Sequence, residues 1–277
     1  MTQTTQNEYV LGTGNDELER LGIQHRIWAD SATSAWKRAG IGPGCEVLDV
    51  GCGPGYASVD IAQLVTQEGC VIGLDESASF VSYVNQKAEK YDLPQLSALT
   101  GDAQNLLLSL PKGQLFDAIY CRWVLCWLPD PKKALDGMLR VLKPGGKLII
   151  HDYFNWKSMT SAPRSSAVEK MVLAAVSSFE DRNADIDIAA KLPSMLHASG
   201  FEVLHFDVHQ RVARGGGLDS TLAWPLTWWR TYGPKLVQLG KLSKQDCNDA
   251  MDDLDDLENN PDRFFVCPAL YEIIAIK

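Results

Sequence analysis

The chain of 277 residues is longer than a typical single domain, so we expect one α/β core with a substantial addition. Its composition, 45% hydrophobic and 22% charged, is that of a globular protein with a sizeable buried core and argues against global disorder. A formal net charge of −9, without a long basic cluster, disfavours nucleic acids and anionic membranes as partners, because both repel an acidic protein.

The first 40 residues form a separate segment, which we interpret as an N-terminal helical cap covering residues 1–40. Asn15–Ala39 is predicted to form one long helix or two broken ones, ending before the sequence GIGPG at 40–44. Such a segment packs over the edge of a sheet or lies across a ligand. The sequence does not choose between these two positions.

From residue 46 onward, short β-branched runs alternate with longer amphipathic ones. The predicted strands cover residues 46–50, 71–74, 96–99, 116–121 and 147–151, and the predicted helices between them cover residues 55–66, 78–91 and 131–141. Apolar strands separated by helices indicate a parallel sheet that is covered on both faces.

The pattern changes after Asp152. Helices are predicted at 162–179 and 186–198, a sixth strand at 201–208, and a seventh at 264–276 that is interrupted only by Pro268. Residues 210–263 are too many for a plain loop and are rich in helical patterns. The expected organisation is therefore a core at 41–209 and 264–277, with a helical insertion at 210–263 that forms a substrate lid.

The stretch VLDVGCGPG, at Val47–Gly55, links the first predicted strand to the first helix of this core. Such a turn directs backbone N–H groups and the positive end of a helix dipole to the carboxyl edge of the sheet. A dinucleotide fingerprint needs a further glycine at position 56, which is tyrosine here, and the Gly-Lys-Ser/Thr of a P-loop is absent. The loop therefore disfavours NAD and nucleoside triphosphates as ligands.

Three aspartates lie in or at the ends of the first three strands. Asp49, within the first strand, is placed to accept from an ammonium group, and Asp75, at the end of the second, from both hydroxyls of a ribose. Asp102, after the third strand, is placed to accept from an adenine amino group. A ligand with a cation, a ribose and an adenine but no phosphate satisfies all three. S-adenosylmethionine is such a ligand.

Five motifs follow one another between residues 46 and 153: VLDVGCGPG, VIGLD ending at Asp75, GDA at 101–103, FDAIYCRWVLCWLPD from Phe116, and MLRVLKPGGKLIIHDY from Met138. On these motifs the chain resembles the class I S-adenosylmethionine-dependent methyltransferases, and most of all their small-molecule, ubiquinone-biosynthesis-like branch. The resemblance implies an α/β fold with a Rossmann-like, doubly wound seven-stranded sheet. The implied strand order is 3-2-1-4-5-7-6, with strand 7 antiparallel, and the implied cofactor is S-adenosyl-L-methionine.

The resemblance also implies which residues hold that cofactor. The glycines would pass under the methionine moiety, Asp75 would bind the ribose, and the residues after the third strand would hold the adenine. Further candidates stand beside the ribose, after the fourth strand and in the N-terminal segment that often closes the pocket of this family. The full set is Tyr9, Gln24, Trp28, Asp49, Gly51, Gly53, Gly55, Asp75, Glu76, Ser77, Asp102, Ala103, Cys121 and Arg122.

Candidate catalytic residues are His151, Asp152 and His25. The first two stand at the carboxyl end of the fifth strand, near the place where the methyl group should emerge, and His25 can reach the site from the cap. Neighbouring side chains on a strand face opposite sides, so only one of the pair is expected to face the site. His151 is interpreted either as a general base or as a histidine packed under a helix. A base is needed only if the acceptor is a hydroxyl or an acidic carbon.

Two other features allow more than one interpretation. The tryptophans Trp224, Trp228 and Trp229 of WPLTWW form either an aromatic wall around a substrate or an anchor for the insertion. The acidic run at 249–262 lacks the ligand spacing of a calcium loop and has apolar residues at every third position. It is predicted to be an amphipathic helix, and no metal site is expected.

The cysteines and the N-terminus bear on the cellular compartment. The seven cysteines are scattered without a C-x-x-C pair, which predicts neither a disulfide framework nor a zinc site. The first ten residues lack the features of a signal peptide, and no apolar run is long enough to span a bilayer. We expect a cytoplasmic protein.

The function that this sequence predicts is S-adenosylmethionine-dependent transfer of a methyl group to O, N or C of a small-molecule acceptor, by in-line displacement. Nucleic acid and membrane are not expected as partners, and a homodimer is left open. The alternatives are an RNA or protein methyltransferase, a non-catalytic protein that binds S-adenosylmethionine for regulation, and a nicotinamide-dependent oxidoreductase. Tyr56 disfavours the last of these.

Overall fold

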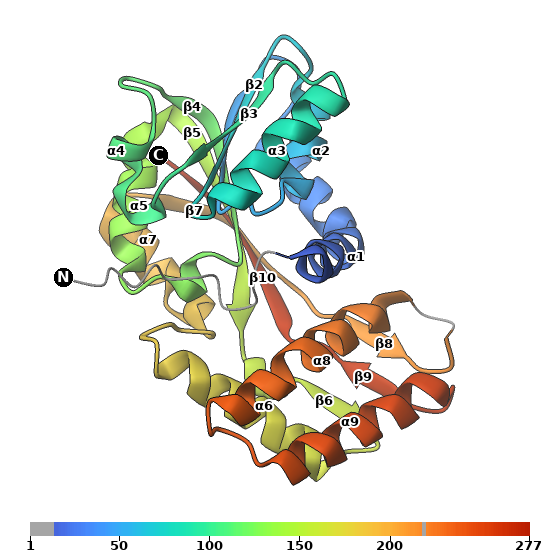
Figure 1. Cartoon of the computed structure of the whole chain (residues 1–277). Helices are drawn as coiled ribbons and strands as arrows, with labels where there is room; N and C mark the ends of the chain where they lie inside the picture. Colours follow the sequence, from blue (N-terminus) through green and yellow to red (C-terminus); the bar gives the residue numbers. More distant parts are fainter. Residues whose placement is uncertain (1–13, 218–219) are drawn as a thin grey trace, which may run out of the picture.

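The computed structural model describes residues 14–217 and 220–277. Within these ranges the chain forms a seven-stranded sheet in the order β3-β2-β1-β4-β5-β10-β7 (Figure 1). Its strands are β1 (Glu46–Val50), β2 (Cys70–Asp75), β3 (Leu96–Thr100), β4 (Phe116–Arg122), β5 (Leu142–Phe154), β7 (Glu202–His209) and β10 (Ala269–Ile276). Because β7 is the sixth of these strands along the chain and β10 the seventh, the predicted order 3-2-1-4-5-7-6 is confirmed.

The directions of the strands also follow the prediction. The pairs among β1 to β5 are parallel, whereas β10 is antiparallel to both β5 and β7. The strand order reverses between β1 and β4, which pair with Asp49 opposite Tyr120. In a doubly wound sheet, this point of reversal opens a crevice at the carboxyl ends of the strands. The fold therefore places the glycine loop after β1 at such a crevice.

Helices cover both faces of the sheet. One face carries α1 (Asn15–Ala39), α2 (Tyr56–Val65) and α3 (Ala78–Lys90), which bury Trp36, Ile61 and Val84 against it. The other carries α4 (Leu106–Ser109), α5 (Pro131–Val141) and α7 (Leu192–Ser199). Of the two forms expected for the N-terminal segment, the structure has the single unbroken helix.

Local capping explains why several helix starts were predicted accurately. Asp130 accepts from the backbone N–H of Lys133, and Pro131 occupies the first turn of α5, where a missing N–H costs nothing. Ser77 caps α3 in the same way by accepting from the backbone N–H of Phe80. Gly40 ends α1 in the left-handed conformation that favours glycine.

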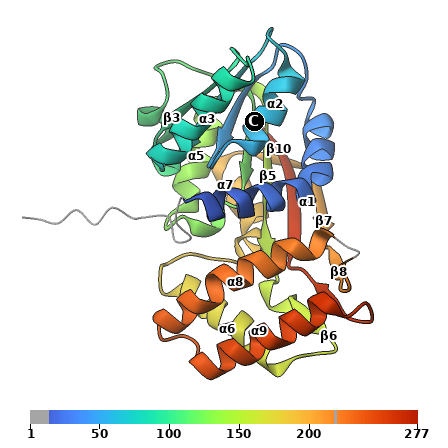
Figure 2. The same ribbon diagram turned by 45° about the vertical axis from the view of Figure 1, so that its right-hand side comes forward.

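A second group of elements, which we call the small-sheet lobe, packs beside the carboxyl edge of the large sheet (Figures 1 and 2). It consists of β6 (Thr160–Ala162), α6 (Ser166–Glu180), β8 (Val212–Arg214), α8 (Ala223–Gln238), α9 (Lys244–Asn259) and β9 (Phe264–Val266). Its sheet has the antiparallel order β6-β9-β8. The helices of the expected insertion at 210–263 thus pack with β6 and α6, which come from residues before it.

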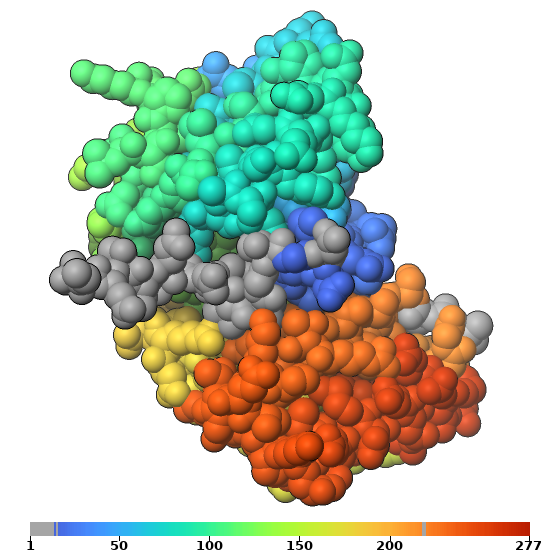
Figure 3. Space-filling view, in the orientation of Figure 1, coloured from blue at the N-terminus to red at the C-terminus, as the bar shows by residue number. Residues whose placement is uncertain are grey.

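The position of α1 joins the two parts. In Figures 2 and 3, α1 (blue) lies between the large-sheet core (cyan to green) and the orange helix α8 of the small-sheet lobe. Trp28 of α1 is fully buried there, with its ring edge-on to Trp123 and Trp224. The cap therefore belongs to both hydrophobic cores.

Several predicted elements differ from the observed ones, and β5 (Leu142–Phe154) extends beyond the predicted 147–151 at both ends. The run at 264–276 is two strands in different sheets, β9 and β10, because the chain changes direction at Pro268, whose missing N–H cannot continue a ladder. The helix expected at 162–179 begins only at Ser166, after a cap by Ser165. The helix expected at 186–198 is a short 3-10 turn, Ile188–Ala190, followed by α7.

The remaining short elements were not predicted. They are the 3-10 turns Ala103–Asn105, Leu125–Trp127, Trp156–Ser158 and Ser220–Leu222, together with α4, β6 and β8. Among the described residues, no helix is both long and apolar enough to cross a membrane.

Candidate functional site

A cavity of about 890 Å³ lies at the carboxyl ends of β1, β2 and β4. Its floor is the glycine loop and the strand ends. Its other walls come from α1, from the end of α6 and from α8. The N-terminal helix therefore packs on the sheet and also borders this cavity, so both positions that the sequence left open apply to it.

The three glycines of the loop all have positive φ, at 67° for Gly51, 52° for Gly53 and 74° for Gly55. A Cβ on Gly51 would lie 2.2 Å from Val124, and one on Gly55 would lie 2.6 Å from Val84, so these two glycines are required by close packing. A Cβ on Gly53 would meet no atom within 4 Å. The backbone at Gly53 is therefore open to a ligand, and Gly55 does not line the cavity.

Asp75, at the end of β2, holds the glycine loop in place. One carboxylate oxygen accepts from the backbone N–H of Gly53 at 2.9 Å and the other from that of Ser77 at 2.9 Å. Burial raises the pKa of Asp75 above its ordinary value, although both hydrogen bonds favour the charged form. The neighbouring Glu76 borders the same cavity, and burial followed by the charges of Asp75 and Asp102 raises its pKa.

Asp49 lies under the loop, at the closed end of the cavity. It is buried and accepts from the hydroxyl of Ser58 at 2.5 Å. Burial raises its pKa to about 6, while the hydrogen bond from Ser58 and the charge of Arg122 act in the opposite direction. A cation bound beside Asp49 would shift this carboxyl toward its charged form.

Asp102 borders the far end of the cavity and is exposed. It accepts from the backbone N–H of Gln104 at 2.8 Å and from the side-chain amide of Asn105 at 2.6 Å. These bonds fix the carboxylate at the start of the turn that contains Ala103, which also lines the cavity. Asp49, Asp75 and Asp102 are thus brought to one cavity, in the order that the sequence predicts.

A chain of polar groups links β4, α1 and α2. Arg122 donates to Nδ1 of His25 at 3.0 Å, and Nε2 of His25 lies 2.9 Å from a carboxylate oxygen of Asp60. Since arginine only donates, Nδ1 is the acceptor and Nε2 carries the proton. Burial lowers the pKa of His25 despite the hydrogen bond to Asp60. His25 is therefore a neutral positioning group whose lone pair is already used.

Arg20 on α1 gives the cap a second anchored polar group. Its guanidinium donates to both carboxylate oxygens of Glu17, at 2.7 and 2.6 Å, and to the side-chain oxygen of Gln24 at 2.7 Å. Arg20 and Gln24 both line the cavity. The network fixes the predicted residue Gln24 against the cavity wall.

The structure places several predicted residues outside the cavity lining. Trp28 is buried between the two cores, Cys121 is buried under the sheet, and Ser77 serves as the cap of α3. Tyr9 lies outside the described residues. Trp28 packs edge-on against Trp123 and Trp224, and Cys121 of β4 packs in the core between the sheet and helices α4, α5 and α7. The hydroxyl of Ser77 is used by its hydrogen bond from the backbone N–H of Phe80.

His151 and Asp152 also lie outside the lining, on opposite faces of β5. The imidazole of His151 is buried and lies 3.0 Å from the hydroxyl of Tyr120 and 3.4 Å from Glu272. Asp152 is buried on the other face, where it accepts from the backbone N–H groups of Cys126 and Tyr153. Burial raises the pKa of Asp152 to about 7. Neither side chain reaches a ligand in the cavity.

The half of the cavity away from the glycines is aromatic. The rings of Trp156 and Trp228 meet edge-on with their centroids 5.0 Å apart, and the ring centroids of Trp127 and Phe179 are 4.3 Å apart. Of the WPLTWW tryptophans, Trp228 lines the cavity, whereas Trp224 and Trp229 are buried in the small-sheet lobe. Both interpretations of that motif therefore apply, to different residues.

Unpartnered hydrogen-bond donors gather around this aromatic half. Among the described residues, four buried donor atoms in side chains that line the cavity have no hydrogen-bond partner: Nη1 of Arg122, Nη1 of Arg182, Nε1 of Trp123 and Nε1 of Trp156. Buried donors without partners are costly, so a ligand that places hydrogen-bond acceptor atoms beside these four would be stabilised here.

Six further residues line the cavity without having been predicted from the sequence: Arg20, Tyr120, Tyr153, Trp156, Phe179 and Arg182. Tyr153 lies near the carboxyl end of β5 and Trp156 just after it, and a position at the end of a strand was a usable signal for both. Phe179 and Arg182 stand at the end of α6, and only the packing of the small-sheet lobe brings that helix to the cavity.

Comparison with known proteins gives a family match. The model of a family described as a methyltransferase domain matches residues 41–207. A demethylmenaquinone methyltransferase of Oceanobacillus iheyensis is 35% identical over 126 residues, which are 46% of this chain and 50% of the relative. The chain spans about half the length of the curated relatives that it matches.

Solved structures of low sequence identity share the fold. The [4+2]-cyclase SpnF is 20% identical with a TM-score of 0.54, over 90% of this chain and 80% of that one. A phosphoethanolamine N-methyltransferase of Haemonchus contortus, solved with phosphomonomethylethanolamine and S-adenosylhomocysteine, is 18% identical with a TM-score of 0.56. That match covers 93% of this chain and 57% of the other.

Proposed function

Because the chain belongs to the methyltransferase domain family, we propose that it transfers the methyl group of S-adenosylmethionine to a small-molecule acceptor bound in the aromatic half of the cavity. The observation that carries the proposal is the single cavity that joins the glycine loop and its three aspartates to the aromatic wall. The methyl donor and the methyl acceptor can therefore come into contact within this one cavity.

The glycine half of the cavity fits S-adenosylmethionine. The open space over Gly53 admits the methionine moiety, and Asp49, whose pKa is raised to about 6, is a suitable partner for its ammonium group. Each oxygen of Asp75 accepts only one backbone hydrogen bond, so each retains capacity for a ribose hydroxyl. Asp102 and Ala103 stand at the adenine end.

S-adenosylmethionine, when bound, supplies a methyl group on a positively charged sulfur, which is already a strong electrophile. The protein therefore contributes mainly orientation and the exclusion of water. The hydrogen bonds of His25 to Arg122 and to Asp60 hold α1 against β4 and α2 beside the cavity. We propose that the N-terminal cap and the helical insertion at 210–263 act as the cover that excludes water, as the sequence division predicts.

The aromatic half of the cavity fits a methyl acceptor that is a flat ring with hydrogen-bond acceptor atoms at its edge. Trp127, Trp156, Phe179 and Trp228 offer apolar faces and edges, which suit an aromatic ring. The unpartnered donors of Arg182 and Trp156 suit a carbonyl or an oxyanion. We therefore propose a planar acceptor with a carbonyl, carboxylate or acidic hydroxyl group.

Deprotonation of this acceptor needs no histidine base in the proposal. The lone pair of His25 is used by Arg122, and His151 does not line the cavity. The guanidinium groups of Arg122 and Arg182 would lower the pKa of an acidic hydroxyl or carbon bound beside them, because positive charge favours the anionic form. The acceptor would then bind with its nucleophilic atom already ionised.

Product formation tests the proposal. The purified chain is incubated with S-adenosylmethionine and a panel of ring acceptors, among them demethylmenaquinone, the substrate named for the matched relatives. Release of S-adenosylhomocysteine that depends on a ring acceptor is expected, with aliphatic amines as negative controls. Binding of S-adenosylmethionine without turnover of any acceptor would favour a regulatory protein instead.

The walls of the cavity favour a small acceptor over RNA or protein. The acceptor half is bordered by α1, α6 and α8, so a polymer could not lie across it without displacing an element. Calorimetry with S-adenosylmethionine and NAD addresses the remaining alternative. Tight binding of NAD without binding of S-adenosylmethionine would overturn the proposal.

A further inference from the structure

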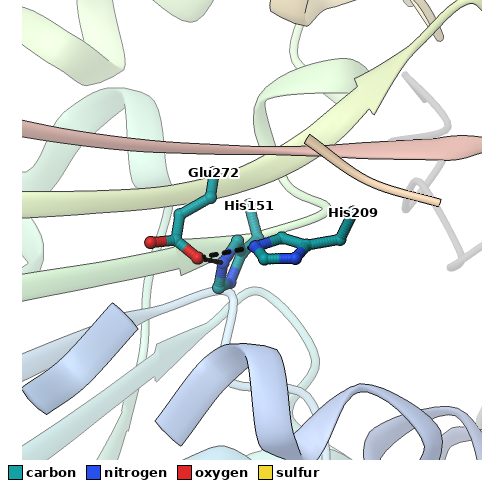
Figure 4. Close-up of side chains that lie close together, drawn as sticks. All are labelled: His151, His209 and Glu272. Atoms are coloured by element: carbon teal, nitrogen blue, oxygen red, sulfur yellow. Dashed lines mark hydrogen bonds and ion pairs between the residues drawn. The ribbon is translucent and has the colours of Figure 1, made fainter. Parts of the chain in front are cut away.

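A second cluster of chemically active side chains lies on the large sheet, outside the cavity. His151 on β5, Glu272 on β10 and His209 on β7 point toward one another (Figure 4). Nε2 of His209 lies 2.8 Å and Nε2 of His151 lies 3.4 Å from the same carboxylate oxygen, Oε2 of Glu272. None of the three lines the cavity.

The sheet register explains why these residues meet. Glu272 is directly opposite His151 in the pair β10–β5, and His209 is opposite Leu270 in the pair β10–β7. Since His205 and His209 are four residues apart on a strand, their side chains share one face of the sheet. The side chains of His151, His205, His209 and Glu272, from three strands, are thus placed together. His151 and Glu272 are 121 residues apart in the sequence.

The second oxygen of Glu272 has its own partners. Arg38 of α1 forms an ion pair with Oε1, and Nε2 of His205 lies 3.4 Å from the same atom. That nitrogen of His205 is buried and has no hydrogen-bond partner among the described residues. Arg38 thus already supplies a positively charged partner for the carboxylate, and three imidazole nitrogens converge on it from the strands on either side of β10.

We propose that His151, His209 and Glu272 bind a divalent transition-metal ion of the zinc type. Their ligand atoms all lie within 4.8 Å of one another. Zinc accepts imidazole nitrogen and carboxylate oxygen at about 2.0–2.2 Å, which separates ligand atoms by roughly 3.4 Å in a tetrahedral site. Small side-chain movements would bring the three atoms to that geometry, and a water molecule would supply the fourth ligand.

Tyr120 supports the site from behind. Its hydroxyl lies 3.0 Å from Nδ1 of His151, the ring nitrogen that faces away from Glu272. With a metal on Nε2, the proton of His151 resides on Nδ1 and is donated to the hydroxyl of Tyr120. A hydrogen bond from the other ring nitrogen fixes the tautomer and orientation of a ligating histidine. Tyr120 also lines the cavity, so the metal would hold one part of the cavity wall.

The metal would have a structural role because it fastens the last two strands of the sheet to β5. Strand β7 lies at the edge of the sheet and pairs with β10. The metal would add a side-chain link from His209 of β7 to β10 and β5. The inference stands apart from methyl transfer. Metal binding is measured without S-adenosylmethionine or an acceptor, and either proposal can fail while the other holds.

Titration of the metal-free protein tests the site. The protein is treated with a chelator, desalted and titrated with Co²⁺, whose visible absorption reports a tetrahedral site, and then with Zn²⁺ by calorimetry. One equivalent of each ion is expected to bind, with the intense visible bands of four-coordinate Co²⁺. Absence of binding, or binding with only the weak bands of octahedral Co²⁺, would overturn the proposal.

Variants assign the binding to these residues. His209→Ala removes a ligand that is 25% exposed on an edge strand, so the protein should fold, and its Zn²⁺ affinity should fall by more than about 100-fold. His197→Ala, an exposed histidine on α7, is the matched control and should bind as the parent does. Equal loss of affinity in both variants, or in neither, contradicts the assignment.

Tyr120→Phe tests the supporting role without removing a ligand. Zn²⁺ affinity should fall by about 10- to 100-fold, with the four-coordinate Co²⁺ spectrum retained. Circular dichroism of each variant shows whether it is folded. If Tyr120→Phe is folded and its affinity is unchanged, the hydroxyl does not position His151.

Discussion

The two halves of the cavity differ in how their hydrogen bonds are satisfied. In the glycine half, the three aspartates already accept from neighbouring groups: Asp49 from Ser58, Asp75 from Gly53 and Ser77, and Asp102 from Gln104 and Asn105. In the aromatic half, buried donors of Trp156 and Arg182 have no partner among the described residues. The polar groups of the first half are therefore already paired, whereas the second half keeps donors that a ligand could use.

This difference matches the chemistry of the two ligands in the proposed reaction. A methyl donor of fixed structure binds well to a rigid site, because protein groups that are already oriented lose no further entropy on binding. The acceptor site gains specificity from its unpaired donors, because an acceptor that lacks matching atoms leaves them buried and unsatisfied. The four predictions below test this contrast, from the largest expected effect to the smallest.

Gly51→Ala should break the preformed half. Alanine at a φ of 67° costs about 1–2 kcal/mol, and its Cβ would lie 2.2 Å from Val124, which adds about 1–3 kcal/mol of overpacking. We expect a loss of about 3 kcal/mol in the free energy of unfolding and no measurable binding of S-adenosylmethionine. Denaturant unfolding and calorimetry measure these effects. Gly42→Ala, which has no atom within 4 Å of its Cβ, should leave both unchanged.

Asp75→Ala should weaken S-adenosylmethionine binding by about 100-fold, with a smaller effect on stability. The carboxylate would bind the ribose, and it also holds the backbone N–H groups of Gly53 and Ser77. A charge-assisted hydrogen bond contributes about 1.5–3 kcal/mol, equivalent to 10- to 100-fold in affinity for each bond lost. Calorimetric affinity equal to that of the exposed control Glu68→Ala would exclude the ribose-binding role.

Arg182→Gln should weaken binding of the methyl acceptor and leave binding of S-adenosylmethionine unchanged. The KM for a ring acceptor should rise by about tenfold, corresponding to one lost charge-assisted hydrogen bond of about 1.4 kcal/mol, while the affinity for S-adenosylmethionine stays unchanged. Arg164→Gln is the matched control, because Arg164 is exposed and pairs with Glu169 away from the cavity. A weakened donor affinity in Arg182→Gln would show that the two halves are not separate.

Asp49 predicts a pH dependence of donor binding. Its pKa of about 6 lies above the unfolded value of 3.8, so ionisation costs folding stability as pH rises through this range. Binding of a cationic donor instead requires the ionised form, so affinity should fall by about tenfold from pH 7.5 to pH 5. Asp49→Asn should bind more weakly at pH 7.5 but without this dependence. If the affinity for S-adenosylmethionine depends on pH identically in parent and variant, the titrating group is a residue other than Asp49.

The sequence predicted most of the large sheet because its signals are local. The strand Glu46–Val50 and the helix Pro131–Val141 were predicted to the residue, since alternating apolar runs, an aspartate cap and a proline in the first turn act within a few residues. The glycine loop and the aspartates after β2 and β3 were found in the same way. Parallel strands carry their carboxyl ends to one edge, so local positions sufficed to predict the cofactor end of the cavity.

The tertiary structure decided what the sequence left open or placed elsewhere. His151 faces Glu272 rather than the cavity, because the register of β5 with β10 sets which groups meet on that face. Phe179 and Arg182 reach the cavity only because α6 packs with α9 in the small-sheet lobe. Such contacts join residues far apart in the chain and depend on packing between elements, which no local pattern encodes. The sequence by itself therefore determined the sheet and the glycine loop with its three aspartates at the carboxyl edge, and only the packing of the lobe against the sheet decided which residues line the aromatic half of the cavity.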